Sequence, residues 1–251
     1  MLPEVVFLDV GDTLVRADPS WADVYSSVFP EFDLTFSRDD FHRALSEVFQ
    51  GWTAEGPFEA TEEASFQRLK ELDSAVFARL GRPDMPDAFF RRVDEAFRAR
   101  SAWWVFPDVV PALDALLAAG VRLGVISNWS WYAPELLHDL ELARHFETLV
   151  ISARVGYQKP HRGIFEHALE VMRVAPERAI HVGDSYTADV EGARAVGIRP
   201  VFIDRRVGEA GHSHGALPAG EDVATITDLF GLLDLLGLKR PAATSMMTLA
   251  S

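Results

Sequence analysis

Three aspartates stand at points of the sequence where carboxylates could do chemistry. Asp9 directly follows the apolar run VVFL, and Asp184 and Asp189 lie far downstream in the stretch HVGDSYTAD. In open α/β sheets, ligands collect at the carboxyl ends of the strands. Two acidic clusters at such strand ends indicate a divalent cation and a nucleophilic carboxylate.

Further polar groups lie between these clusters. Ser127 and Asn128 end the strand-like segment 121–126, and Lys159 follows in VGYQKP. Crowded carboxylates repel, and one of them gains a proton unless positive charge lies nearby. A magnesium ion, which takes oxygen ligands, and the Lys159 ammonium would supply that charge. The same groups could offset the charge on a transferring phosphoryl group.

The elements that must position these side chains alternate between strand and helix. Apolar runs predict strands at 5–8, 121–126, 148–151, 179–182 and 200–203, with a last edge strand at 223–226. Helical patterns separate most of them. This alternation predicts an α/β fold, with a parallel sheet covered by helices on both faces.

Residues 17–103 have a different pattern of apolar and polar residues. No strand-like run occurs there, and the pattern predicts amphipathic helices. We therefore expect a core domain formed by 1–16 and 104–238, an inserted all-helical domain at 17–103, and a disordered tail at 239–251. Because the insertion leaves the sheet just after Asp9, we expect it to cover the acidic edge as a lid.

Composition excludes several classes of function. The 251 residues carry a net charge of −14, which argues against nucleic-acid and anionic-membrane partners. The absence of cysteine excludes disulfides and thiolate chemistry. No apolar run approaches the roughly 18 residues of a membrane span, and the first residues lack the pattern of a signal peptide. We expect a cytoplasmic protein of unspecified oligomeric state.

The candidate site residues resemble, in order and type, the four motifs of the haloacid dehalogenase-like (HAD) hydrolase superfamily. They are Asp9, Ser127–Asn128, Lys159 and the Asp184/Asp189 pair. The resemblance covers nearly the whole chain except the tail. It implies a three-layer, Rossmann-like core, with a helical cap inserted between the first and second motifs. The short stretch between Asn128 and Lys159 leaves no room for the larger α/β cap.

The resemblance further implies a magnesium-dependent phosphohydrolase of a small phosphorylated metabolite, a phosphate monoester, through an aspartyl-phosphate. Asp9 would be the nucleophile, and Lys159 would bridge it to the phosphoryl group. Ser127 and the backbone amide of Asn128 would hold phosphoryl oxygens. Ser185 would support the acidic turn. The expected Mg²⁺ ligands are Asp9, the backbone carbonyl of Gly11, Asp184, and Asp189 directly or through water.

One position departs from the family pattern. Most phosphatases of the superfamily carry a second aspartate two residues after the nucleophile, where this sequence has Gly11. General acid–base help is typically worth about 10²–10⁴-fold in rate, so its loss predicts slow turnover unless Asp12 substitutes. Two alternatives stay open: a metal-independent haloacid dehalogenase, and a catalytically weak ligand-binding or regulatory protein.

Two remaining expectations concern side chains outside the motifs. Trp129 follows Asn128 at the edge of the site, so it is a candidate for substrate contact. Aromatic side chains more often pack in a core or a domain seam. The adjacent Arg205 and Arg206 are expected to be a solvated pair.

Overall fold

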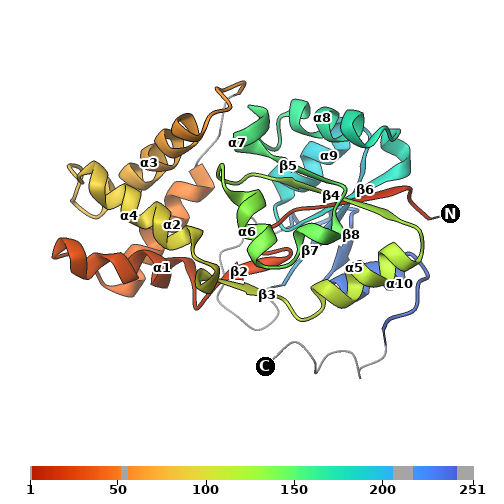
Figure 1. Cartoon of the computed structure of the whole chain (residues 1–251), viewed down its shortest axis with the longest axis horizontal. Helices are drawn as coiled ribbons and strands as arrows, with labels where there is room; N and C mark the ends of the chain where they lie inside the picture. Colours follow the sequence, from red (N-terminus) through yellow and green to blue (C-terminus); the bar gives the residue numbers. More distant parts are fainter. Residues whose placement is uncertain (1, 52–55, 206–216, 242–251) are drawn as a thin grey trace.

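Six parallel strands form the sheet at the centre of the molecule (Figure 1). The computed structural model describes residues 2–51, 56–205 and 217–241, so Arg206 and residues 242–251 of the expected tail lie outside the described residues. The strand order β5-β4-β1-β6-β7-β8 places β1 between β4 and β6. The strands are β1 (Val5–Leu8), β4 (Arg122–Ser127), β5 (Thr148–Ile151), β6 (Ala179–Gly183), β7 (Arg199–Ile203) and β8 (Ala224–Ile226).

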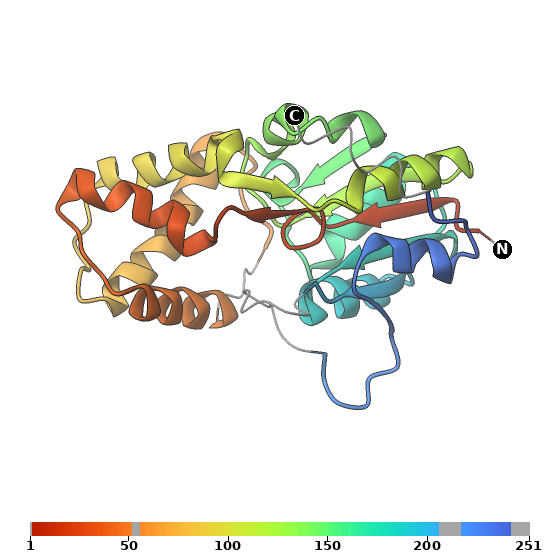
Figure 2. The same ribbon diagram turned by 90° about the horizontal axis from the view of Figure 1, so that it is seen from below.

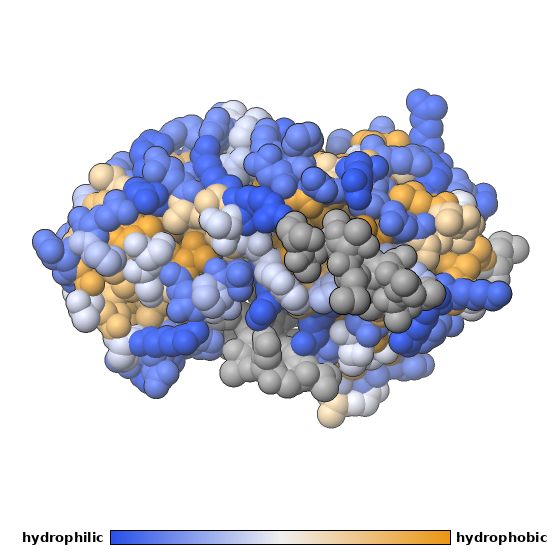
Figure 3. All heavy atoms as spheres, turned by 60° about the horizontal axis from the view of Figure 1, so that its bottom comes forward, coloured by the Kyte–Doolittle hydropathy of each residue, from blue (hydrophilic) through white to orange (hydrophobic). Residues whose placement is uncertain are grey.

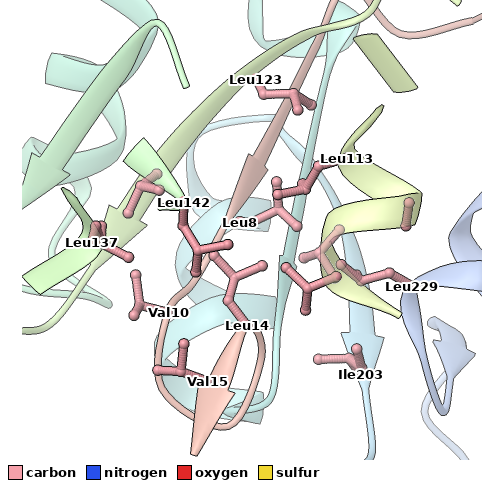
Figure 4. Close-up of a cluster of buried hydrophobic side chains, with 14 of the residues drawn as sticks. Leu8, Val10, Leu14, Val15, Leu113, Leu123, Leu137, Leu142, Ile203 and Leu229 are labelled. Carbon is pink, nitrogen blue, oxygen red and sulfur yellow. The ribbon is translucent and has the colours of Figure 1, made fainter. Parts of the chain in front are cut away.

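Helices cover both faces of this sheet, and β1 shows why. Its four residues are fully buried; Val6 and Leu8 belong to one hydrophobic cluster, and Val5 and Phe7 to another. Successive side chains of a strand point to opposite faces, so an uninterrupted apolar run fits a strand buried on both sides. Figure 4 shows Leu8 beside Leu113 and Leu14 in the first cluster. The predicted α/β class is confirmed.

The helices of the sheet layers follow the strands in sequence. They are α5 (Val109–Ala118), α6 (Ala133–Asp139), α7 (Ser152–Val155), α8 (Arg162–Met172), α9 (Gly192–Ala195) and α10 (Leu229–Leu235). Short 3₁₀ turns lie at η1 (Phe29–Phe32), η2 (Arg100–Ala102), η3 (Ala143–His145) and η4 (Pro176–Arg178), and η5 (Tyr186–Glu191) is a π-helix. Among the described residues, no helix is both long and apolar enough to cross a membrane.

The helices that the structure describes in the insertion pack around a hydrophobic cluster of their own, to the left of the sheet in Figure 1. They are α1 (Trp21–Val28), α2 (Arg38–Gly51), α3 (Glu62–Arg79) and α4 (Asp87–Arg98). The side chains of Ser20 and Thr61 accept N–H groups at the starts of α1 and α3, as N-cap residues do. Aromatic rings fill the cluster: Phe77 and Phe89 meet edge to face, with centroids 4.7 Å apart.

A two-stranded antiparallel ribbon, which the sequence did not predict, connects the insertion to the sheet (Figure 2). It pairs β2 (Val15–Ala17) with β3 (Trp103–Val105). Each strand has three residues, which is too short to produce a recognisable alternation of apolar and polar residues. The ribbon brings the two ends of the helical insertion together.

The expectation that Arg205 is solvated is wrong. Its guanidinium forms a buried bidentate ion pair with Asp108, with both N···O distances 2.9 Å, and its Nε donates to the carbonyl of Thr13 at 2.8 Å. Asp108 also accepts the backbone N–H of Leu229 at 2.7 Å. This network connects the end of β7 to the loop that follows Asp9, and only the tertiary fold brings these segments together.

The helical insertion contacts the loops at the carboxyl edge of the sheet. Ser65 of α3 accepts the backbone N–H of Trp131 at 3.1 Å, and Tyr132 donates to Asp94 of α4. Arg68 of α3 donates to Gln158 at 2.7 Å. The face in Figure 3 mixes hydrophilic and apolar residues over both parts of the molecule.

Candidate active site

Three predicted site residues stand at the ends of adjacent strands. Asp9 follows β1, Ser127 is the last residue of β4, and Asp184 follows β6. Since β4 and β6 flank β1 in register, the three side chains start from one edge of the sheet. The N–H of Asp9 donates to the carbonyl of Val182 at 2.9 Å, which continues the ladder past the strand end.

Lys159 connects two of the aspartates. Its Nζ lies 2.6 Å from Asp9 Oδ1 and 2.6 Å from Asp189 Oδ1, and the lysine is only 3% exposed. Burial alone would lower the pKa of Lys159, but the charges of Asp189 and Asp9 raise it well above its ordinary value. The ammonium is therefore a fixed positive charge in contact with the Asp9 carboxylate.

The turn after β6 holds Asp189 firmly. Asp189 lies on the π-helix η5, and its Oδ2 accepts the N–H of Ser185 at 3.0 Å. The Ser185 hydroxyl accepts the N–H of Ala188 at 3.2 Å, so this serine supports the acidic turn from two sides. Burial alone would raise the pKa of Asp189, but Lys159 and His181 hold it well below its usual range.

The three aspartates could hold a metal ion. Asp9, Asp184 and Asp189 each offer a carboxylate oxygen, and these atoms lie within 4.8 Å of one another. Burial raises the pKa of Asp184 well above its ordinary value, and the charges of neighbouring aspartates raise it further. A divalent cation would relieve that repulsion, and oxygen-only donors fit Mg²⁺. The donor set therefore fits the predicted magnesium site.

Ser127 and Asn128 differ in the hydrogen bonds that their side chains make. The buried Oγ of Ser127 has no hydrogen-bond partner among the described residues, and buried polar atoms are otherwise nearly always satisfied. The Asn128 side chain bonds the backbone of Lys159 in both directions, at 2.7 and 2.9 Å. Ser127 is thus free to bind a ligand, whereas the Asn128 amide fixes the lysine loop.

The sequence comparison decides the family. Residues 3–197 match the family described as haloacid dehalogenase-like hydrolase. This chain belongs to that family.

Individual relatives agree with the assignment. This HAD-like hydrolase is 37% identical over 228 residues to a phosphoserine phosphatase from Thermus thermophilus, covering 80% of this chain and 89% of that protein. It is 36% identical over 120 residues to haloacid dehalogenase-like hydrolase domain-containing protein 3 from Xenopus laevis. That second match spans only about half of either protein, at 48% and 49%.

A solved structure shares the fold. The crystal structure of a HAD-hydrolase from Bacillus subtilis bound to magnesium superposes with a TM-score of 0.74 at 18% identity, covering 94% of this chain and 100% of that one. The expected HAD fold with a helical insertion is therefore confirmed.

The loop after Asp9 is where this HAD-like hydrolase departs from the family pattern. A Cβ added to Gly11 would lie 3.0 Å from Cζ3 of the half-buried Trp129. Asp12 has a left-handed backbone, with φ of 50°, and its N–H donates to the carbonyl of Val15. Burial and the charge of Asp9 raise the pKa of Asp12 to about 7, although Arg16 and Arg205 lower it.

One polar contact of the site was not expected from the sequence. His181, inside β6, is fully buried, and its Nε2 lies 2.7 Å from Asp189 Oδ1. The available signal was a histidine in an otherwise apolar strand that ends at the acidic turn. A lone buried histidine is common enough that this signal did not single it out.

Proposed function

We propose that this HAD-like hydrolase is a magnesium-dependent phosphatase that cleaves a small phosphate monoester through an aspartyl-phosphate on Asp9. The observation that carries the proposal is the contact of Asp9 with Lys159 beside two further carboxylates. This arrangement pairs a buried carboxyl nucleophile with the positive charge that phosphoryl transfer needs. The phosphatase name of the Thermus relative supports the substrate class.

Mg²⁺ would be held by Asp9, Asp184, the carbonyl of Gly11, and Asp189 directly or through water. When bound, it supplies charge that offsets the phosphoryl oxygens and the crowded carboxylates. The remaining contacts to the phosphoryl group come from the chain itself. Ser127 Oγ, which is buried without a partner in the described part of the chain, would donate one hydrogen bond, and the backbone N–H of Asn128 another.

Asp9 would attack the phosphorus, and the bond from phosphorus to the ester oxygen would break. Lys159 Nζ, held at 2.6 Å from Asp9 Oδ1, would orient the Asp9 carboxyl and offset charge on the phosphoryl group. Water would then attack the phosphorus of the aspartyl-phosphate. This second step releases inorganic phosphate and restores Asp9.

Asp12 is our candidate for the proton transfers, because Gly11 has no acidic group. Its pKa of about 7 allows it to be either protonated or ionised near neutral pH. It would give a proton to the departing ester oxygen and take one from the attacking water. The charge of Asp9 raises the pKa of Asp12, and the charge of Asp12 raises the pKa of Asp184, so Asp12 belongs to the same cluster of carboxyls.

The helical insertion would act as the cap that excludes bulk water and selects the substrate. We propose residues 17–103 as this cap domain, and 1–16 with 104–238 as the core. Trp129 stands beside Gly11 and meets Trp103 at a centroid distance of 4.8 Å and Trp21 at 6.3 Å. Its half-buried ring is a candidate contact for the leaving group.

An aryl phosphate assay with and without Mg²⁺ tests the proposal, followed by a panel of phosphorylated metabolites. We expect turnover only with Mg²⁺, and none from Asp9→Asn. Radiolabelled phosphate should be trapped on the wild type and not on Asp9→Asn. Release of halide from a haloacid in the presence of EDTA would instead show a dehalogenase. Metal binding with no turnover across the panel would show a binding protein.

A further inference from the structure

His181 occupies a position where the fold alone would favour an aliphatic residue. It lies in the middle of β6, which pairs with β1 on one side and β7 on the other, and it has no exposed surface. The ring of Phe165 meets its imidazole edge to face, at 5.4 Å and 87°. A polar ring so enclosed requires a hydrogen-bond partner, and the partner it has belongs to the candidate active site.

The contact defines which nitrogen carries the proton. Nε2 lies 2.7 Å from Asp189 Oδ1, and a carboxylate oxygen only accepts, so Nε2 is the donor. Nδ1 is buried with no hydrogen-bond partner in the part of the chain that the structure describes. A proton on Nδ1 would therefore be a buried donor without an acceptor. The geometry therefore assigns a hydrogen to Nε2.

The Asp189 carboxylate is held by donors on both oxygens. Oδ1 accepts from His181 Nε2 and from Lys159 Nζ, while Oδ2 accepts the N–H of Ser185. Gly183 leaves room for this carboxylate, because a Cβ there would lie 2.1 Å from Asp189 Cγ. The carboxylate has no freedom to rotate while all of these contacts are made.

We propose that His181 is a positioning residue that fixes the Asp189 carboxylate and thereby holds Lys159 Nζ on the nucleophile Asp9. The chain of contacts is continuous, at 2.7 Å from His181 to Asp189 and at 2.6 Å for each of the two lysine contacts. Without the imidazole N–H, the carboxylate oxygen loses one of its two restraints, and the lysine loses its fixed anchor. This inference rests on the proposed function for its effect on turnover.

A pair of matched variants tests it. Glutamine and methionine have similar lengths, but only glutamine can present an N–H to Asp189. We expect His181→Met to lower kcat about 10- to 100-fold, the range typical for residues that orient a site ligand, with KM changed less than threefold. His181→Gln should recover most of that loss. If both variants lose kcat equally, or if His181→Met keeps the wild-type kcat, the proposal is wrong.

Two NMR readouts do not depend on turnover. Nitrogen-detected spectra of the wild type should show a hydrogen on Nε2 of His181; a ring with its hydrogen on Nδ1 alone would overturn the inference. The sequence has three lysines, Lys70, Lys159 and Lys239, and of these Lys159 is buried. Its protected ammonium signal should persist in His181→Gln and vanish in His181→Met. If the wild type shows no turnover at all, the proposed function fails. The Lys159 ammonium signal then decides the role of His181 by itself. A signal that persists in both variants would refute that role.

Discussion

The indole ring of Trp129 packs on the backbone of Gly11, two residues after the proposed nucleophile. A Cβ at position 11 would lie 3.0 Å from Cζ3 of that ring, which is closer than ordinary van der Waals contact. The position at which most phosphatases of the family carry their acid is therefore sterically matched to glycine in this chain. The indole occupies the space into which a side chain would extend.

This contact predicts that Gly11→Asp alone will not speed up the enzyme. The new side chain would displace Trp129 or distort the loop that carries Asp9, and a small misplacement of reacting groups can cost about 10²-fold in rate. In the double variant Gly11→Asp/Trp129→Ala, the carboxyl has room. We expect kcat for an alkyl phosphate to be at least about tenfold higher in the double variant than in Trp129→Ala, since general acid–base help is worth about 10²–10⁴-fold.

Steady-state kinetics of the two single variants and the double variant check this prediction. Melting temperatures measured in parallel separate a folding defect from a catalytic one. A gain in Gly11→Asp equal to that in the double variant would show that Trp129 does not restrict position 11.

Asp12→Asn should remove one limb of the pH profile. The pKa of Asp12 is raised to about 7 by burial and by the charge of Asp9, so the protonated donor is present below about pH 7 and is lost above it. The rate of the first chemical step in the wild type should therefore fall as the pH rises through 7. Asparagine tolerates the left-handed backbone of this position but cannot transfer a proton.

Single-turnover rates between pH 5 and 9 test this prediction with two substrates. For an alkyl phosphate, we expect Asp12→Asn to be about 10²-fold slower than the wild type. Its rate should also no longer fall as the pH rises above 7. With an aryl phosphate, whose leaving group needs little protonation, the rate of the variant should fall much less. Equal rates for the variant and the wild type on both substrates would exclude Asp12 from proton transfer.

Gly183→Ala should damage the site more than its small size suggests. The added Cβ would lie 2.1 Å from Asp189 Cγ, so the carboxylate would have to leave its contacts with Lys159 and Ser185. We expect kcat to fall at least about 10²-fold and the free energy of unfolding to fall by roughly 1–3 kcal/mol. Urea denaturation and an aryl phosphate assay measure both quantities.

Gly56→Ala is a matched control for that variant. A Cβ at Gly56 would meet no atom of the described residues nearer than 3.7 Å, so kcat and stability should stay close to the wild-type values. A Gly183→Ala variant as active as this control would mean that Asp189 can move without loss of function.

The sequence predicted the parallel sheet and the strand-end aspartates because both depend on local order. A buried parallel strand is a continuous apolar run, and the residue after it is fixed at the sheet edge. The sequence did not predict the contact between Arg205 and Asp108, which are 97 positions apart. Lys159 is 150 positions from Asp9, and its contact with that residue was expected only from the family resemblance. For Lys159, a family motif marked the position, whereas nothing in the sequence around Arg205 or His181 distinguished it from an ordinary residue.

The buried hydrogen bond between Tyr25 and Asp73 in the helical insertion predicts that stability depends on pH. The Tyr25 hydroxyl donates to Asp73 Oδ1 at 2.5 Å, and Asp73 is 5% exposed. Burial raises the pKa of Asp73 to about 7, although the tyrosine hydrogen bond lowers it. Between about pH 4 and 7, the folded state therefore keeps a proton that the unfolded state has lost, and the free energy of unfolding falls as the pH rises across that window.

Asp73→Asn removes this penalty and keeps an oxygen that accepts from Tyr25. The variant and the wild type should have similar stability near pH 4, and the variant should be more stable at pH 8 by roughly 2–4 kcal/mol, since each unit of pKa corresponds to about 1.4 kcal/mol. Urea denaturation at both pH values measures the difference. Tyr25→Phe is the control: it leaves the buried carboxyl without its donor, and we expect it to destabilise the protein by about 1–3 kcal/mol at pH 8. A variant Asp73→Asn that loses stability with pH in parallel with the wild type would show that another group titrates in this window.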